Sequence, residues 1–476
     1  FLKRPTMNSQ TKANGTPASE GEPLSFYAKA EKIHPREVSG RYARLRVLAV
    51  LVLLGLYYIV PWLSWGERQA VLFDLPARKF YSFGLTFWPQ DFFYLAILLI
   101  IAALSLFFFT ALAGRLWCGY ACPQTVWTEV FIWIERLIEG RRNQRIKLDK
   151  AAWNGRKLWL KVLKHGIWIS FALYTGFTFV GYFTPIKVLT TELASFSLGP
   201  WETFWVLFYG FATYGNAGWM REQVCIYMCP YARFQSAMFD KDTLIISYDS
   251  ARGELRGSRR KGADLKATGL GDCVDCKACV QACPTGIDIR NGLQYQCIGC
   301  AACIDVCDEI MDKMGYERGL VRYTTEHSVE HQQTHVLRPR VFVYAGILLL
   351  LVSGLSYAVL NRTPLELGII RDRNTLYRET GNGLIENVYT LKLLNMDGAD
   401  HSYTVSVSGL PGMDLVMEPK EISVPSGGVL NLPISVRIDP EDLRTSSSEI
   451  EFQLQSVDQP DLKTRSKARF IGPAPQ

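Results

Sequence analysis

The sequence predicts a multidomain protein in which an all-α polytopic membrane core of five transmembrane helices carries a small cysteine-rich insert and a C-terminal immunoglobulin-like β-sandwich. Three observations lead to this fold class: apolar runs long enough to cross a bilayer, eight of the twelve cysteines between positions 273 and 307, and period-two alternation of apolar residues after position 360. The expected domains are a tail at 1–46, four membrane helices at 47–249, the cysteine-rich domain at 250–337, a fifth helix at 338–360 and the sandwich at 361–476.

The polar N-terminal tail leads into the first apolar run. Residues 7–40 are rich in Lys, Glu, Ser, Pro and Gly and have no sustained hydrophobic period, which is typical of a mobile segment. Arg41, Arg44 and Arg46 stand directly before the apolar run at 47–63. Because Lys and Arg concentrate at the cytoplasmic ends of membrane helices, we expect the tail in the cytoplasm.

Four further apolar runs alternate with loops of unequal charge, at 91–112, 166–184, about 202–219 and 341–360. The loop from Arg136 to Lys164 carries ten Lys or Arg against two acidic residues, which indicates the cytoplasmic side. With five spans, the cysteine-rich insert shares that side and the C-terminal domain lies outside. The net charge of +7 arises from Lys and Arg beside the apolar runs, so we expect no nucleic-acid partner.

An internal repeat follows the second and fourth runs. Each copy reads CxxxCP, and its cysteines are Cys118, Cys122, Cys225 and Cys229. Two copies 107 positions apart imply a pseudo-symmetric four-helix unit. Proline favours the first turn of a helix, so Cys122 and Cys229 are expected at helix starts, where the helix dipole lowers the pKa of a thiol.

Four such thiols brought together would suit Cu(I), which prefers soft ligands, and Met228 could add a thioether. These cysteines are therefore our candidate catalytic and copper-binding residues. The alternative is that they are buried apolar thiols that pack the helix ends.

The cysteine-rich insert contains two tight runs, CVDCKACVQACP and CIGCAACIDVCD. This spacing is typical of a bacterial-type ferredoxin domain with two [4Fe-4S] clusters, in which each cluster takes three thiolates from one run and the fourth from the other. The expected ligands are Cys273, Cys276, Cys279 and Cys307 for the first cluster, and Cys297, Cys300, Cys303 and Cys283 for the second. A zinc site, the alternative, would use two CxxC pairs with a long spacer. A domain of this kind passes single electrons.

Three histidines at i, i+4 and i+8 would share one stripe of a connecting helix: His327, His331 and His335. They are candidates for a metal site, although such residues more often decorate a solvated helix. His165 and His401 stand alone and are interpreted as structural. The sequence has no CxxCH motif, transmembrane histidine pair or GxGxxG turn, so we expect neither haem nor a nucleotide cofactor.

The C-terminal domain alternates in period two between turn residues. Its expected strands lie within NVYTLKLLN, HSYTVSVSG, LVMEPKEISV, VLNLPISVRI, EIEFQLQSV and KARFIG. Six or seven short strands in this span predict an immunoglobulin-like sandwich without its usual disulfide, since no cysteine follows Cys307. No catalytic motif lies in this domain, so we expect a partner-docking or stabilising role.

The duplicated CxxxCP, the paired cysteine runs and the stretch CGYACPQTVWTEVF resemble the FixG/RdxA/CcoG family of cytochrome oxidase accessory proteins, over almost the whole chain beyond the tail. The resemblance implies a bacterial inner-membrane protein that reduces Cu(II) to Cu(I) during assembly of cbb-type cytochrome c oxidase. It implies that the four CxxxCP cysteines lie near copper and that the eight insert cysteines hold the clusters. Its implied partners are copper ions and copper chaperones or oxidase assembly factors; the electron donor and the oligomeric state stay open.

Two other hypotheses follow from the same features. The CxxxCP core also resembles the ferredoxin-type subunits of nitrate and nitrous-oxide respiration, which implies a quinol-linked electron conduit without copper chemistry. The third hypothesis is a non-catalytic assembly scaffold, in which the sandwich binds the oxidase and the clusters stabilise the insert.

Overall fold

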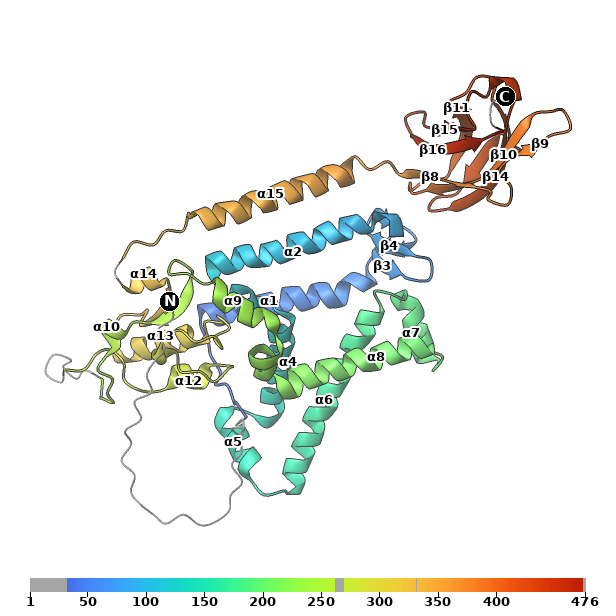
Figure 1. Cartoon of the computed structure of the whole chain (residues 1–476). Helices are drawn as coiled ribbons and strands as arrows, with labels where there is room; N and C mark the ends of the chain where they lie inside the picture. Colours follow the sequence, from blue (N-terminus) through green and yellow to red (C-terminus); the bar gives the residue numbers. More distant parts are fainter. Residues whose placement is uncertain (1–31, 262–268, 331, 474–476) are drawn as a thin grey trace, which may run out of the picture.

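Three long apolar helices run between the two ends of the protein (Figure 1). The computed structural model describes residues 32–261, 269–330 and 332–473. Within these residues, three helices are long and apolar enough to cross a membrane: α1 (Arg41–Ile59), α2 (Phe92–Ala113) and α15 (Pro339–Leu360). Helices α2 and α15 pack along each other in opposite directions, and the hydroxyl of Tyr94 near the start of α2 donates to the carbonyl of Ala358 near the end of α15, 3.2 Å away.

The cysteine-rich domain lies at one end of these helices and the β-sandwich at the other (Figure 1). At the first end, the carboxylate of Asp305 accepts hydrogen bonds from the backbone N–H groups of Tyr42 and Ala43, at 3.1 and 2.6 Å. Asp305 therefore caps the start of α1, where backbone N–H groups have no partner within the helix. At the same end, Arg338 before α15 pairs with Asp240 at 2.7 Å.

The third and fourth predicted spans are helices of a different kind. Helix α6 (Gly155–Val180) has 26 residues but carries several lysines in its first half. Helix α8 (Pro200–Thr213) has 14 α-helical residues, which extend about 21 Å against about 30 Å of bilayer core. It continues as the π-helical segments η3 (Tyr214–Met220) and η4 (Val224–Met228). By length and composition, neither helix joins the three apolar ones.

Helices α6 and α8 pack against each other closely at two glycines. A Cβ on Gly176 would lie 2.3 Å from the carbonyl oxygen of Val206, and one on Gly210 would lie 3.0 Å from the side chain of Leu173. Shorter helices connect the membrane helices: α3 (Leu116–Tyr120), α4 (Pro123–Glu139), α5 (Arg142–Lys150), α7 (Ile186–Ala194) and α9 (Pro230–Met238).

The loop between α1 and α2 is folded, although its sequence predicts a loop lying along the membrane interface. Strands β3 (Val71–Asp74), β4 (Lys79–Ser82) and β5 (Leu85–Phe87) form an antiparallel sheet, preceded by the hairpin of β1 (Ser64–Trp65) and β2 (Arg68–Gln69). The strands are very short and rich in aromatic residues, so their sequence resembles an interfacial loop.

The cysteine-rich domain is built on one two-stranded sheet and two short helices. Strand β6 (Ile245–Tyr248) pairs antiparallel with β7 (Val321–Thr324). Helices α12 (Ala278–Ala282) and α13 (Ala302–Met314) each begin inside a cysteine run. The minor elements are α10 (Ser250–Gly253), η5 (Ile289–Asn291) and α14 (Glu326–Val329).

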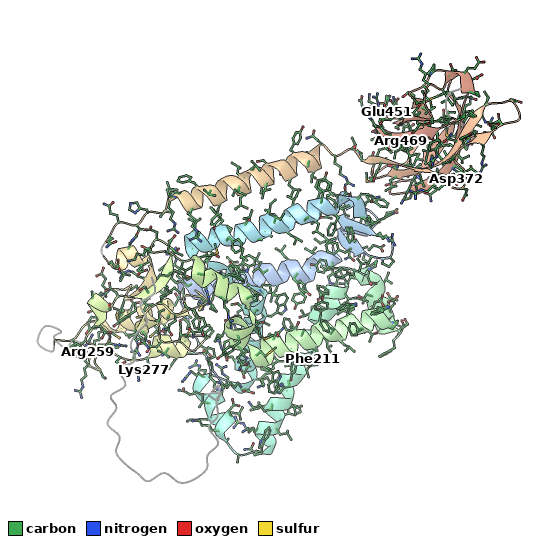
Figure 2. All side chains as sticks on the ribbon, viewed as in Figure 1. Phe211, Arg259, Lys277, Asp372, Glu451 and Arg469 are labelled. Atoms are coloured by element: carbon green, nitrogen blue, oxygen red, sulfur yellow. The ribbon has the colours of Figure 1, made fainter. Side chains whose placement is uncertain are left out.

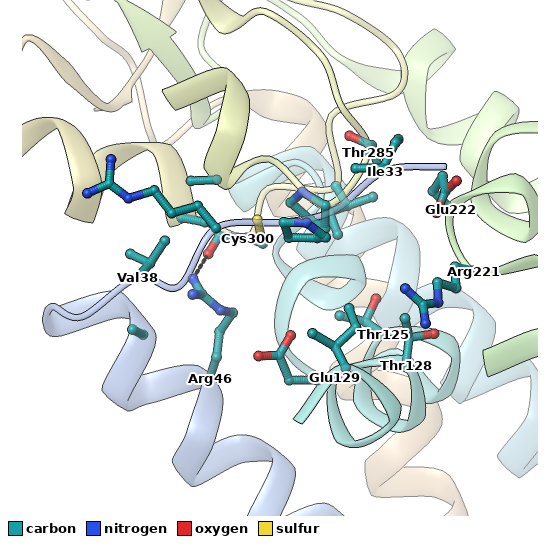
Figure 3. Close-up of a pocket in the computed structure, with 18 of the residues that line it drawn as sticks. Ile33, Val38, Arg46, Thr125, Thr128, Glu129, Arg221, Glu222, Thr285 and Cys300 are labelled. Atoms are coloured by element: carbon teal, nitrogen blue, oxygen red, sulfur yellow. Dashed lines mark hydrogen bonds between the residues drawn. The ribbon is translucent and has the colours of Figure 1, made fainter. Parts of the chain in front are cut away.

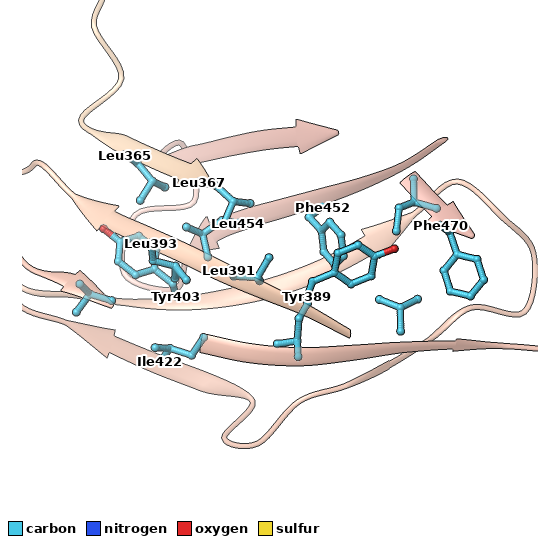
Figure 4. Packing of buried hydrophobic residues seen from close by; sticks show 14 of the residues in the cluster. Leu365, Leu367, Tyr389, Leu391, Leu393, Tyr403, Ile422, Phe452, Leu454 and Phe470 are labelled. Atoms are coloured by element: carbon cyan, nitrogen blue, oxygen red, sulfur yellow. The ribbon is translucent and has the colours of Figure 1, made fainter. Parts of the chain in front are cut away.

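The C-terminal domain is the predicted sandwich of two antiparallel sheets (Figure 4). One sheet has the order β12-β14-β10-β8, with β9 beside β10, and the other has the order β13-β11-β15-β16. The strands are β8 (Leu365–Arg371), β9 (Arg378–Glu379), β10 (Ile385–Asn395), β11 (His401–Ser408), β12 (Asp414–Val416), β13 (Glu421–Val424), β14 (Val429–Ile438), β15 (Ser447–Ser456) and β16 (Lys463–Ile471). Tyr389, Leu391, Tyr403 and Phe452 fill the core between the sheets without a disulfide.

Three details of the sandwich differ from the predicted strands. The stretch LVMEPKEISV contains two strands, β12 and β13, which belong to different sheets. Strand β8 was not predicted, because its sequence LELGIIR alternates weakly and follows closely on α15. Strand β9 was not predicted either, because it has only two residues.

Candidate functional site

The structure gathers the eight insert cysteines around two separate cavities. One has about 360 Å³ of atom-free space and is lined by Cys273, Cys276, Cys279 and Cys307. The other has about 330 Å³ and is lined by Cys283, Cys297, Cys300 and Cys303, with Cys279 touching both. The partition therefore matches the two ligand sets expected from the spacing, each with three cysteines from one run and one from the other.

The two cysteine runs have the same backbone conformation. The residues on either side of the second cysteine have positive φ in both runs: Asp275 and Lys277 in the first, Gly299 and Ala301 in the second. Three of these four are not glycine, and non-glycine residues adopt this conformation at an energetic cost. The repeated backbone thus bends each loop around its cavity before α12 and α13 begin.

The remaining walls of the cavities are apolar, and this raises the pKa of the thiols. Burial raises the pKa of Cys300 and Cys307 to about 12 and that of Cys279 to about 11. A thiolate in such a wall requires a nearby positive charge, which iron would supply. Four thiols around each apolar cavity fit a [4Fe-4S] cluster, and a bound cluster would carry single electrons.

The CxxxCP motifs are also brought together. Cys122 and Cys229 have extended backbone conformations directly before Pro123 of α4 and Pro230 of α9, as predicted for residues at helix starts. The thiol of Cys118 donates to the side-chain oxygen of Gln235 on α9 at 3.3 Å, so the first motif contacts the helix that follows the second.

The expectation of a lowered thiol pKa at a helix start is wrong for Cys122. Burial raises the pKa of Cys118 and Cys225 to about 12. Burial also raises the pKa of Cys122, against the lowering effect of the N–H groups of Gln124 and Thr125 at the start of α4. The helix-start effect is therefore present, but desolvation is larger. Within the described residues, no three His, Cys, Asp or Glu side chains surround a single metal position, so the copper site stays a prediction.

The first thiol motif packs directly on the loop of the second cluster cavity. Gly119 lies between Cys118 and Cys122, and a Cβ there would lie 2.8 Å from the carbonyl oxygen of Gly299 and 2.9 Å from the backbone of Cys300. Only glycine permits this approach. The contact brings the two candidate centres, far apart in sequence, into van der Waals contact through their backbones.

Two arginines and a tyrosine hold the same loop in place. Arg46 of α1 donates to the carbonyl of Cys300, and Arg115 after α2 donates to the carbonyl of Cys297 at 3.3 Å. The hydroxyl of Tyr323 on β7 donates to the carbonyl of Gly299 at 2.6 Å and lies 3.5 Å from the hydroxyl of Tyr120. The cluster loop is thus hydrogen-bonded to α1, to Arg115 just after α2 and to β7.

A cavity that is open to solvent lies between these parts, with about 1040 Å³ of atom-free space when the solvent at its mouth is included (Figure 3). Its wall includes Cys225 of the second thiol motif and Cys300 of the second cluster set. Glu129 and Glu222 place carboxylates along it, and Arg46 reaches across it to Cys300. Burial raises the pKa of Glu222.

A buried ionic network stabilises the helices beside this cavity. Glu135 of α4 pairs with Arg145 at 3.2 Å, with Arg221 at 3.0 Å and with Lys164 at 3.5 Å. Glu135 and Arg145 have fully buried side chains. Burial would raise the pKa of Glu135, but the surrounding cations hold it well below its usual range. Arg221 therefore ties the end of the fourth predicted span to α4.

The predicted histidine stripe does not form. Helix α14 ends at Val329, and His335 lies outside any helix, while His331 lies outside the described residues. The ring of His327 and the backbone N–H of His335 instead both contact the carboxylate of Asp242, at 2.8 and 2.9 Å. Thr325 caps α14 and the chain turns after one helical turn, so the spacing of four residues has no helix to follow.

Three other predicted residues are placed as follows. Met228 is 58% exposed at the end of η4, and its role as a copper ligand stays a prediction. His165 contacts the hydroxyl of Tyr214 at 2.9 Å and stacks on Trp219. His401 is buried in the sandwich beside Asp397 at 2.8 Å.

Sequence reasoning missed Gly119, Arg46, Arg115 and Asp305 as parts of the site. The two arginines stand beside apolar runs, where membrane orientation already accounts for them. Gly119 carried a usable signal, because a glycine between two cysteines of a duplicated motif marks a close backbone approach.

Comparisons with known proteins agree with this arrangement. Residues 220–326 match a family described as a 4Fe-4S dicluster domain, residues 95–142 a 4Fe-4S binding domain, and residues 355–473 the Ig-like fold at the C-terminus of FixG. The methylamine utilization ferredoxin-type protein MauN of Methylorubrum extorquens is 28% identical over 39% of this chain and 53% of its own length.

Two longer matches cover most of the chain. The nitrogen fixation protein FixG of Rhizobium meliloti is 40% identical over 81% of this chain and 81% of its own length. Protein RdxA of Cereibacter sphaeroides is 42% identical over 82% of this chain and 85% of its own length. With its iron-sulfur cavities, its duplicated thiols and its C-terminal sandwich, the chain belongs to the FixG/RdxA family of iron-sulfur electron-transfer proteins.

Proposed function

We propose that this protein is a membrane-bound cupric reductase that supplies Cu(I) for assembly of a cbb-type cytochrome c oxidase. The observation that carries the proposal is the contact of Gly119 with the backbone of Gly299 and Cys300. It joins a thiol motif suited to Cu(I) to a loop that holds a cluster ligand. Bound clusters would supply single electrons, and Cu(II) needs one electron to become Cu(I).

The residues of the chain have distinct parts in this function. The candidate copper ligands are Cys118, Cys122, Cys225 and Cys229, and their soft thiolates favour the reduced ion over Cu(II). Arg46 and Arg115 fix the loop of Cys297 and Cys300 against these thiols. The cavity that reaches Cys225 offers copper a route with carboxylates, Glu129 and Glu222, as oxygen ligands for Cu(II) along its wall.

The proposed setting is a bacterial inner membrane crossed five times, with α6 and α8 as the third and fourth spans. An odd number of crossings is supported by the position of the cysteine-rich domain and the sandwich at opposite ends of α1, α2 and α15, and five is the number proposed. The arginines before α1 and the basic loop at 136–164 favour cytoplasmic clusters and a periplasmic sandwich. The proposed partners are copper chaperones or oxidase assembly factors.

The test is rapid mixing of anaerobic, reduced protein with Cu(II), followed by the EPR signal of Cu(II). We expect the wild type to remove the signal, and Cys118→Ser/Cys225→Ser to remove it at least about tenfold more slowly, equivalent to about 1.4 kcal/mol. Persistence of the Cu(II) signal with the wild type would overturn the proposal.

Gly119→Ala tests the contact itself. An added Cβ would push the thiol motif off the cluster loop, so we expect slower Cu(II) reduction with unchanged iron content. Gly215→Ala is the matched control, because a Cβ on Gly215 meets nothing within 4 Å. Equal rates for both variants would show that the contact does not serve electron transfer.

A second candidate function, quinol oxidation, is favoured by the same cavity. Its wall joins apolar groups such as Val47, Ile132 and Trp133 to the carboxylates of Glu129 and Glu222. A quinol oxidised to the quinone there would give one electron to each of two bound clusters and its two protons to the carboxylates. Reduction of the clusters by a short-chain quinol in wild type, and its loss in Glu222→Gln, would support this function over copper reduction.

A further inference from the structure

The eight insert cysteines differ in their access to solvent. Cys276 is exposed, whereas the other seven are buried or half-buried. The second cluster set is covered by the thiol motif and by α1, as the contacts of Gly119 and Arg46 show. An external protein can therefore approach the first cluster set, through Cys276, far more closely than the second.

The surface beside Cys276 is built by a basic segment that runs along the first cysteine loop. The backbone N–H of Gly257 donates to the carbonyl of Cys273 at 3.2 Å, and that of Gly271 donates to the carbonyl of Leu255 at 3.0 Å. This segment carries five cations: Arg252, Arg256, Arg259, Arg260 and Lys261. Figure 2 shows Arg259 and Lys277 together at the end of the domain that faces away from the apolar helices.

Four carboxylates of this segment and around the first cysteine loop are paired with arginines. Glu254 pairs with Arg256 at 2.9 Å, and Asp272 pairs with Arg252 at 2.5 Å. Arg290 pairs with Asp275 and with Asp288, at 2.6 Å each. Three cations of the segment are left, and Lys277 of the first cysteine loop stands with them. We call these four residues the basic rim: Arg259, Arg260, Lys261 and Lys277. Within the described ranges none of them has an ion pair, but Arg259 is half-buried and donates to the hydroxyl of Tyr316 at 2.9 Å, whereas the other three are exposed.

The basic rim also has an apolar part. Leu255 is 69% exposed although it lies in the segment that is hydrogen-bonded to the cysteine loop. An exposed leucine and exposed cations on a segment that is hydrogen-bonded to the loop of an exposed redox ligand have the mixed apolar and charged character of a small transient electron-transfer interface.

We propose that the basic rim around Cys276 is the docking surface for a small, acidic, soluble protein that carries one electron at a time on a flavin or an iron-sulfur group. The carrier loses one electron, the cluster held by Cys273, Cys276, Cys279 and Cys307 gains it, and no proton or bond changes place. Electrons then enter at Cys276 and leave at the opposite side of the domain, where Cys300 meets Gly119. This proposal depends on the iron-sulfur function of the domain and not on copper.

The experiment uses the full-length, cluster-loaded protein in nanodiscs and flavodoxin as the probe, because flavodoxin is a small acidic one-electron carrier. Flavodoxin hydroquinone is mixed with oxidised protein, and its conversion to the semiquinone is followed at several salt concentrations. Binding of oxidised flavodoxin is measured separately by titration. The variant reverses three charges of the basic rim: Arg260→Glu/Lys261→Glu/Lys277→Glu.

A matched control reverses one arginine and two lysines on the outer sandwich: Lys420→Glu/Arg444→Glu/Lys463→Glu. All three control residues are exposed, and none has an ion pair with another described residue. We expect the basic-rim variant to bind flavodoxin at least about tenfold more weakly and to lose most of the salt dependence of the second-order rate, as for electrostatically steered association. The control should behave as the wild type.

Three results would overturn the proposal. The first is an unchanged flavodoxin affinity and rate in the basic-rim variant, and the second is an equal loss in the sandwich control. The third is unchanged binding together with a shifted reduction potential of the cluster, which would mean that the rim only balances the charge of the cluster. Each result is independent of whether the protein reduces Cu(II), so failure here is distinct from failure of the cupric reductase function.

Discussion

At the scale of single residues, buried charge decides how firmly the helices around the large cavity are held. Glu135 lies among Arg145, Lys164 and Arg221, which come from α5, α6 and the end of η3. Removing one member of a buried ion network leaves the others uncompensated. We therefore expect Glu135→Gln to lower the stability of the purified protein by about 3 to 5 kcal/mol, measured as thermal or denaturant unfolding in detergent.

The control for this prediction is Glu309→Gln. Glu309 pairs with Lys313 at the surface of α13, so its loss should cost no more than about 1 kcal/mol. A similar loss of stability in both variants would contradict the importance of burial.

The lowered pKa of Glu135 predicts that the stability of the folded protein depends on pH. The pKa of Glu135 is lower in the folded protein than the ordinary value of 4.5. A lowered carboxyl pKa stabilises the folded state above the ordinary value, and the stabilisation is lost as pH falls below it. The difference in melting temperature between wild type and Glu135→Gln should therefore be constant from neutral pH to about pH 5 and shrink below it. A difference that grows on acidification would refute the assignment.

Single cysteine substitutions test the partition of the ligands. Cys276 and Cys307 line one cavity and Cys300 lines the other, although Cys300 lies nearer to Cys307 in sequence. We expect Cys276→Ser and Cys307→Ser to lose the same cluster and Cys300→Ser to lose the other, as two distinct EPR spectra of the reduced protein with about half the iron. Matching spectra for Cys300→Ser and Cys307→Ser would contradict the partition.

At the scale of elements, the short sheet between α1 and α2 holds the sandwich in place. Arg362, in the linker after α15, pairs with Asp91 at 2.5 Å and donates to the carbonyl of Thr86 at 2.9 Å. Lys79 of β4 donates to the carbonyl of Gly427 in the sandwich at 2.7 Å. Arg362 therefore acts as a clamp between the end of α15 and the sheet of β3, β4 and β5.

We expect Arg362→Gln to loosen the contact between the sandwich and the sheet of β3, β4 and β5 without unfolding either of them. Hydrogen exchange should rise at least several-fold in β4, β5 and the loop at Gly427, because a half-buried charge pair contributes about 1 to 3 kcal/mol. Arg373→Gln is the control, since Arg373 is exposed and has no ion pair within the described residues. Unchanged exchange in Arg362→Gln would show that the clamp is not needed.

The elements also show what the sequence can predict and what it cannot. Cysteine spacing predicted which cysteines line each of the two cavities, and period-two alternation predicted most strands of the sandwich, because each signal is local. The positions of Gly119, Arg46 and Asp305 depend on contacts between segments some 180 to 260 residues apart, as between Asp305 and Tyr42. No local pattern encodes such contacts. The predicted histidine stripe was wrong although its pattern is local. The spacing of the histidines is regular, but the helix that would carry them ends at Val329.

At the scale of the whole molecule, the two soluble parts lie at opposite ends of three apolar helices (Figure 1). This arrangement predicts opposite accessibility in intact cells. A membrane-impermeant maleimide should label Lys420→Cys on the sandwich from outside, and Lys313→Cys on α13 only after the membrane is opened. Labelling of both from the same side would contradict the topology. The unmodified protein, with its native cysteines, provides the background.

The cap on helix α1 has a consequence for biogenesis. Asp305 satisfies the first N–H groups of α1, yet it follows Tyr42 by 263 positions and lies on α13 between two cluster ligands. During synthesis α1 emerges long before Asp305 exists, so its first turn remains open to water until the iron-binding domain has folded and docked. A helix that is made early is thus capped late, by a residue of the cysteine-rich domain.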